Sequence, residues 1–131
     1  MSVSRLMQMG AAGFVVPELV GVENTVSGAG STPSLTLPSG ISSGDIIVIF
    51  VGVDGTPTAT ITGFTQEIAQ AGGWAASASY YVFSKTADGT EGSSVTLTLS
   101  ASETVCASAW VIANASDVAF SSVSTSTGSV N

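Results

Sequence analysis

The amino-acid sequence predicts an all-β protein, an antiparallel β-sandwich of jelly-roll or Ig-like type preceded by an extended N-terminal arm. β-Branched residues and glycine are abundant, whereas only 8% of the residues are charged, so good exposed helix formers are scarce. Apolar residues make up 44% of the chain, which is too many for a disordered chain. About six to eight short runs separated by turn residues, with no helical period between them, are typical of a sandwich.

Residues 1–20 differ in composition from the rest and are predicted to form the arm. Methionine, alanine and glycine dominate this segment, and Pro17 marks its end. A secretory signal is disfavoured because Gln8 interrupts the apolar stretch and Glu18 follows it directly. The arm is instead a candidate docking segment for another protein, through one cation and four large apolar residues: Arg5, Leu6, Met7, Met9 and Phe14. The alternative is that the arm packs on its own domain and covers a sheet edge.

Residues 21–131 are assigned to the sandwich domain. A first strand is expected at 21–26, a loop at 27–34 and a short strand at 35–37. The stretch 45–54 is apolar at both alternating positions, which predicts a strand that is central or covered on both faces. The Asp-Gly-Thr-Pro that follows it is a strong turn.

The next three strands are expected at 58–71, 75–87 and 94–100. Two glycines end the first of them, and an Asp-Gly-Thr-Glu-Gly turn separates the second from the third. The third has the clearest period of two, which places three side chains inward: Val95, Leu97 and Leu99.

A further long strand is expected at 104–115, followed by a weaker run at 118–124. Cys106 and Trp110 lie in the long strand, and both are expected in the core. Cys106 is the only cysteine, so no disulfide forms within the chain, and no histidine is present to activate its thiol.

The charge excludes two classes of partner. A net charge of −7 opposes binding of nucleic acid and of anionic membrane surfaces. No apolar run reaches the length of about 18 residues that a transmembrane helix requires. We therefore expect neither a nucleic-acid nor a membrane partner.

Catalytic and metal sites are not expected. Asp88 and Glu91 share one turn and could in principle hold calcium, but solvated acids in a hairpin explain them equally well. Paired carboxylates could hydrolyse glycosides, and four acids lie near predicted strand ends: Asp54, Asp88, Glu91 and Asp117. Acids in turns are common on protein surfaces. We therefore expect no catalytic residue, metal or cofactor, and a protein that is not an enzyme.

Two stretches carry a family resemblance. "SRLMQMGAAG" at 4–13 resembles an N-terminal tag of structural proteins of tailed bacteriophages, marine ones especially. The stretches 43–66 and 77–103, with "SGDIIVIFVGVDG" and "YYVFSKTADGTEG", resemble a phage-associated β-sandwich. Such sandwiches commonly continue past a segment like that around Asp117 into another hairpin. Either that part lies outside this sequence, or a neighbour's strand completes the sheet.

The resemblance implies a virion structural protein on the surface of the phage particle. We expect a capsid decoration or cement protein that attaches to the head through its arm. Its partner would be the major capsid protein or another virion protein, and it would form a homo-oligomer, with a trimer favoured. The alternative is a tail-fibre or appendage module that binds a host surface glycan through Trp74 and the loop acids.

Overall fold

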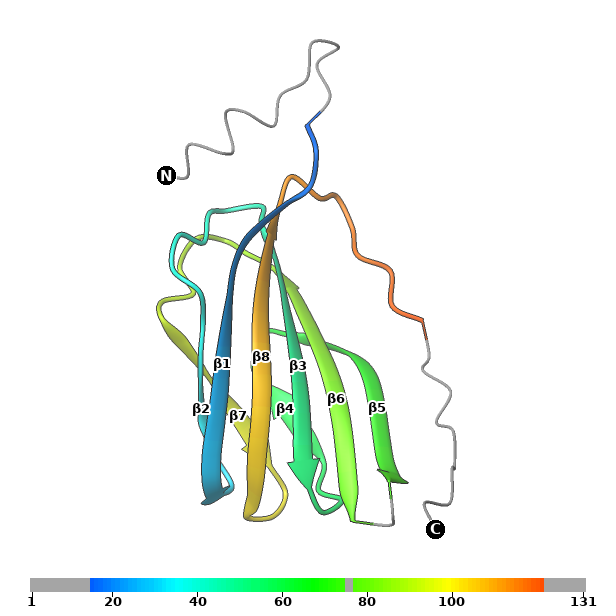
Figure 1. The fold of residues 1–131 in the computed structure, drawn as a ribbon. Helices are drawn as coiled ribbons and strands as arrows, with labels where there is room; N and C mark the ends of the chain where they lie inside the picture. The colour runs from blue at the N-terminus through cyan, green and yellow to red at the C-terminus, as the bar shows by residue number, and fades with distance from the viewer. Residues whose placement is uncertain (1–14, 75–76, 122–131) are drawn as a thin grey trace.

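The computed structural model describes residues 15–74 and 77–121, which form two antiparallel sheets packed face to face (Figure 1). The strands in chain order are β1 (Glu18–Gly30), β2 (Ser34–Thr36), β3 (Ile46–Asp54), β4 (Ala59–Ile61), β5 (Thr65–Trp74), β6 (Ala78–Thr86), β7 (Ser94–Leu99) and β8 (Glu103–Ala113). The predicted antiparallel β-sandwich is thereby confirmed. Within the described ranges, no helix has the length and apolar character needed to span a membrane.

The larger sheet has the strand order β1-β8-β3-β6-β5, so β3 lies at its centre. Ile49 of β3 is opposite Ala109 of β8 on one side and Phe83 of β6 on the other. A strand with two paired neighbours and residues packed against both of its faces has few positions for polar side chains. The apolar character of 45–54 at both parities therefore has the predicted cause, a central position.

The smaller sheet, β2-β7-β4, lies behind the larger one in Figure 1, and the core fills the space between them. Leu97 and Leu99 of β7 are buried and Val95 packs against the core, so the predicted inward face of β7 is confirmed. Each large side chain buried in this way contributes roughly 1.5–3 kcal/mol. The core combines alternate residues of both sheets with Leu37 and Ala87, which directly follow β2 and β6: Leu35, Leu37, Ile47, Ile49, Val51, Val53, Ala59, Ile61, Tyr81, Phe83, Ala87, Leu97, Leu99, Val105, Ala107, Ala109 and Val111.

The single strand expected at 58–71 is wrong, because the chain changes sheets in the middle of it. β4 pairs with β7 in the small sheet, whereas β5 pairs with β6 in the large one. Gly63 has a φ of +82°, and the N–H of Phe64 donates to the carbonyl of Ile61 at 3.1 Å. A glycine at positive φ allows this tight turn without a Cβ clash.

β1 is longer than the strand expected at 21–26. It runs from Glu18, inside the segment predicted as the arm, to Gly30, so the first residues of the loop expected at 27–34 belong to the sheet. Its pairing with β8 extends from Glu18 opposite Ala113 to Gly30 opposite Glu103, with irregular register near each end. Pairing with a long neighbour outweighs the weak strand preference of the Ser and Gly residues.

After β8 the chain turns at Asn114, which has a φ of 60°, and residues 115–121 pass beside the large sheet (Figure 1). Ala115, Val118 and Phe120 pack against a second apolar cluster, formed by Ile46, Val48 and Val82 on the side of the large sheet opposite the core. Residues 118–121 are not a strand, and the rest of the run expected at 118–124 lies outside the described residues.

Candidate functional site

We call the surface of the large sheet that points away from the small sheet the outer face. The antiparallel register arranges its side chains in rows across the strands, because directly paired residues point to the same side. Three rows matter here, each given from β1 to β6: Val22, Trp110, Val48, Ser84; Asn24, Ser108, Phe50, Val82; and Val26, Cys106, Gly52, Tyr80.

Cys106 and Trp110 lie on this outer face, so the expectation that both belong to the core is wrong. Val105, Ala107, Ala109 and Val111 are the buried residues of β8, and the alternating geometry of a strand turns the residues between them outward. Cys106 is exposed, and Trp110 keeps 38% of its surface accessible. The sequence signal that could have predicted this outward orientation is the alternation in β8: Val105 and Val111 are an even number of residues apart, whereas Cys106 and Trp110 fall on the other side of the strand.

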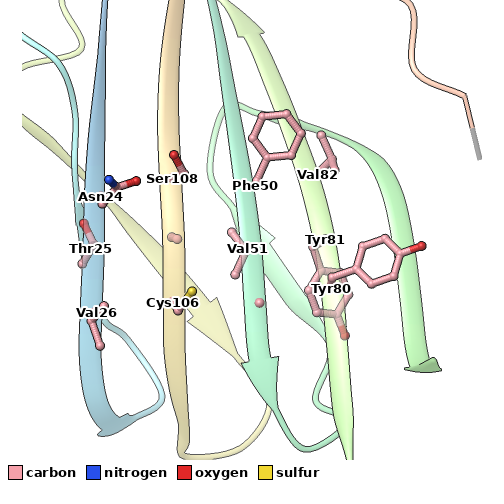
Figure 2. Close-up of a pocket in the computed structure, with 12 residues that line it drawn as sticks. Asn24, Thr25, Val26, Phe50, Val51, Tyr80, Tyr81, Val82, Cys106 and Ser108 are labelled. Carbon is pink, nitrogen blue, oxygen red and sulfur yellow. The ribbon is translucent and has the colours of Figure 1, made fainter. Parts of the chain in front are cut away.

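The third row forms a hollow of about 380 Å³ (Figure 2). Gly52 and Cys106 are paired at its floor and carry little or no side chain. Val26 on β1 and Tyr80 on β6 stand at the two ends of the row, and Phe50 rises beside it. The hollow is therefore a direct product of the register, which places small residues between large ones.

Phe50 lines the hollow, and with Trp110 of the neighbouring row it forms a ridge of two aromatic rings. The rings of Phe50 and Trp110 meet edge to face, with centroids 6.2 Å apart, and Phe50 is 45% exposed. The indole Nε1–H of Trp110 donates to the hydroxyl of Ser108 at 2.8 Å, which satisfies the polar atom of the ring within the chain. The ridge consequently presents mainly carbon to its surroundings.

The three rows contain no charged side chain. The described part of the chain nevertheless holds all nine acids and a single base, Lys85. Glu67 lies at the β5 edge of the face, where it accepts a hydrogen bond from the hydroxyl of Ser84. The three rows thus form a neutral and largely apolar area of an acidic molecule, with Glu67 at one edge and Asp54 at the end of β3 beyond Gly52.

The residues expected to dock on a partner fall outside the description of the structure. Arg5, Leu6, Met7, Met9 and Phe14 all precede Val15, the first described residue. Trp74, expected to contact a glycan, ends β5 opposite Ala78, but its side chain is outside the described set.

The acids at 88–91 form a turn whose hydrogen-bonding groups satisfy one another. The carboxylate of Glu91 accepts from the N–H groups of Asp88 and Gly89 at 2.7 and 3.0 Å. Asp88 accepts from the N–H and the hydroxyl of Thr90 at 2.8 and 2.6 Å. Lys85 places its Nζ 3.1 Å from Glu91 and 3.8 Å from Asp88. These partners give both carboxylates a structural role in the turn.

The pKa values of these two acids are shifted in the direction that opposes general acid catalysis. Hydrogen bonds from the side chain and backbone of Thr90 lower the pKa of Asp88. Burial works to raise the pKa of Glu91, but hydrogen bonds from the Asp88 N–H and Lys85 outweigh it and lower the pKa. A catalytic acid in a glycosidase needs the opposite, a raised pKa.

The loop acids do not converge on one site. Asp54 ends β3, whereas Asp88 and Glu91 follow β6, and these strands are antiparallel, so the two positions lie at opposite ends of the sandwich. Among residues 15–74 and 77–121, no group of three or more His, Cys, Asp and Glu side chains is placed to hold a metal ion. The outer face is thus the candidate functional site.

Family models, curated proteins and solved structures were all compared with the chain, and none of the three gives a match.

Proposed function

We propose that this protein is a virion structural protein that decorates or cements the head of a tailed phage. It would reside on the surface of the particle and attach through residues 4–14 to the major capsid protein or another virion protein. No catalytic step is part of this proposal. Its task would be to bury apolar surface and thereby hold subunits of the shell together.

One observation supports an assembly role over a chemical one. Among the strand side chains that the structure describes, the large apolar ones that are exposed lie on the outer face: Leu19, Val22, Val26, Phe50 and Trp110. Contiguous exposed apolar surface of this kind is typical of sites that bind proteins. The carboxylates at 88–91, in contrast, are engaged within their own turn.

Charge supports the arm as the part that attaches. The described part of the chain has nine acids and one base, whereas the segment before Val15 contains Arg5 and no acid. Leu6, Met7, Met9 and Phe14 would fill apolar pockets on the shell, each contributing roughly 1.5–3 kcal/mol when well buried. Arg5 would pair with an acid of the partner. Several arms in one homo-oligomer would add avidity.

The experiment is an add-back assay with purified phage particles that lack the protein. We expect the labelled full chain to bind in proportion to the major capsid protein, and the chain without residues 1–14 to bind at least tenfold less. Replacing Leu6, Met7, Met9 and Phe14 with Ser should reproduce that loss, while Ser2→Ala and Ser4→Ala should not. Equal binding by the full chain and the shortened chain would contradict attachment through the arm.

A glycan-binding appendage module is the second candidate. Phe50, Trp110 and Tyr80 lie on one open sheet face, with Asn24 and Ser108 between them, and aromatic rings of this kind can stack on sugars. The polar groups there are few, and Trp110 already donates to Ser108, so sugar hydroxyls would find few partners. Copy number separates the two candidates, since an appendage would be far less abundant than the capsid protein.

A further inference from the structure

We propose that residues 115–121 form a displaceable strap, an autoinhibitory contact that leaves the outer face without unfolding of the sandwich. In the closed state the strap lies on the apolar cluster of Ile46, Val48 and Val82, and in the open state it uncovers this cluster. The device does not depend on attachment through the arm. It follows from the contacts that hold the strap, the sheet beneath it, the surface that it hides and the residue at which it begins.

Few contacts hold the strap. Ala115, Val118 and Phe120 pack on the cluster, each of them only partly buried, and the residues between them are exposed. Within residues 15–74 and 77–121, the strap donates and accepts no hydrogen bond to either sheet. The hydrogen bond that it does make is internal, from the N–H of Val118 to the carboxylate of Asp117 at 2.8 Å. A segment with few apolar contacts and no hydrogen bonds to its neighbours belongs to the least stable parts of a fold.

The sheet beneath the strap is complete without it. Val48 is paired with Ser84 of β6 on one side and with Trp110 of β8 on the other. Opening therefore breaks no pairing between strands. The main core lies between the two sheets, on the opposite side of β3, so it stays packed when the strap leaves. The sandwich can consequently remain folded in the open state.

The hidden cluster is continuous with the exposed part of the outer face. Val48 adjoins Trp110 in one row, and Val82 adjoins Phe50 in the next. Trp110 and Phe50 are 38% and 45% exposed, whereas Val48 and Val82 are 2% and 5% exposed. While the strap is seated, no partner can reach the two valines. Opening joins them to the aromatic ridge in one larger apolar area, which is the kind of surface that binds proteins.

The strap begins at a turn that can serve as its hinge. Asn114 has a φ of 60°, in the left-handed region that Asn tolerates better than most residues, and it directs the chain from β8 to the side of the large sheet (Figure 1). Its side-chain amide donates to the Val16 carbonyl over a long 3.4 Å. Hinges are a few residues at the ends of elements that absorb a change in backbone angles. A rotation at this one position moves the whole strap.

Thiol labelling at two valines of β3 tests the proposal, in the full chain with Cys106→Ser. Val48 and Val51 are each 2% exposed, but Val48 lies under the strap and Val51 faces the small sheet. We expect the Val48→Cys thiol to react at least about 100-fold faster than the Val51→Cys thiol, because local opening is more frequent than global unfolding. Its rate should depend little on urea, whereas the rate at position 51 should rise steeply. Equal rates with the same urea dependence would overturn the proposal.

Two further substitutions separate opening of the strap from weakening of the fold. Phe120→Ala removes a contact that exists only in the closed state, so the Val48→Cys thiol should react about 5–30-fold faster. Leu97→Ala weakens the main core, which stays intact in the open state. It should change the rate at position 48 less than about twofold and accelerate the reaction at position 51. A rate at position 48 that responds to Leu97→Ala but not to Phe120→Ala would contradict a displaceable strap.

Limited proteolysis tests the same opening in the unaltered protein. Chymotrypsin cleaves after aromatic residues in accessible chain segments, and the strap offers Phe120 while the core contains Phe83. We expect cleavage after Phe120 while the chain stays intact at Phe83. Cleavage after both residues in parallel would show that the strap opens only with the whole sandwich. Labelling at position 48 as fast as at the exposed Cys106 would show that the strap does not cover the cluster. Either result overturns the proposal.

Discussion

Phe50 on β3 and Trp110 on β8 meet edge to face on the outer face of the sandwich, with an angle of 78° between their ring planes. Such a pair is worth about 0.5–1.5 kcal/mol beyond the area that it buries. Phe50 of this pair lines a hollow that is floored by Gly52 and Cys106. The aromatic ridge and the glycine at the floor of the hollow distinguish the outer face from the rest of this acidic protein.

Gly52→Ala should stabilise the sandwich. Alanine fits the strand backbone and meets nothing closer than 3.7 Å, so we expect the free energy of unfolding to rise by about 0.5–1 kcal/mol. Denaturant titration measures this change in the free energy of unfolding. A Gly52→Ala variant that is less stable than the unaltered protein would contradict this expectation.

Tyr81→Phe should destabilise the sandwich. The Tyr81 ring is buried, and its hydroxyl donates to the carbonyl of Pro57 in the loop after β3. Removing the donor leaves a buried carbonyl without this partner. We therefore expect the free energy of unfolding, measured in urea or guanidinium, to fall by about 1–3 kcal/mol. Tyr80→Phe is the control, because Tyr80 lies half-buried on the outer face, and its cost should stay below about 0.5 kcal/mol.

The turn at 88–91 should make stability depend on pH on the acid side. The pKa values of Asp88 and Glu91 are lowered below their ordinary values of 3.8 and 4.5, so both acids favour folding in the ionised form. That contribution is complete above the ordinary values and is lost as pH falls through the lowered ones. The Tm should therefore be constant near neutral pH and should fall below about pH 4.5.

Glu91→Gln provides the test of this turn. We expect a Tm lower by a few degrees at pH 7 and a shallower decline in acid, because one of the two titrating carboxylates is gone. Glu23→Gln, on an exposed position of β1, is the control and should leave both the Tm and the decline unchanged. A decline in the Glu91 variant as steep as in the unaltered protein would show that other acids cause it.

Phe120→Ala should remove part of the cover over Ile46, Val48 and Val82. Phe120 is partly buried against this cluster, so its truncation should cost about 1–2 kcal/mol, less than the 3–5 kcal/mol of a fully buried Phe. Val26→Ala, at an 80% exposed position, should cost much less. Hydrogen exchange should show faster opening of residues 115–121 in the Phe120 variant alone. Equal stability of the two variants would mean that the packing of Phe120 contributes nothing to the free energy of unfolding.

Deleting residues 1–14 should leave the stability of the sandwich within about 0.5 kcal/mol, because we assign the partner of the arm to another chain. Chemical unfolding of the full and shortened chains gives the comparison. A loss of about 2 kcal/mol or more would indicate that Leu6, Met7, Met9 or Phe14 packs on the chain's own domain.

The sequence predicted the architecture well where alternation is strong. Leu97 and Leu99 in β7, and the doubly apolar β3, need only the period of two and the central position to explain them. The break at Gly63 was missed because alternation continues on both sides of it, and only sheet pairing reveals the change of layer. β1 was underestimated because a paired neighbour extends it through Ser and Gly residues.

The outer face was harder to predict than the fold. Trp110 and Cys106 are apolar residues in an apolar strand, and an apolar residue that points outward is indistinguishable from a core residue without the parity of its neighbours. The hollow needs three strands in register, with Gly52, Cys106 and Val26 brought together from distant parts of the chain. Local sequence patterns do not show which strands pair, so they could not predict the hollow.

Cryo-electron microscopy of the intact particle tests the central claim most directly. The claim is that this sandwich is mounted on a virion by its apolar arm. The account predicts a two-layered β-sandwich on the outside of the shell, with residues 4–14 in contact with a capsid protein or another virion protein. A shell without such a domain, or residues 4–14 folded entirely against their own sheets, would contradict it.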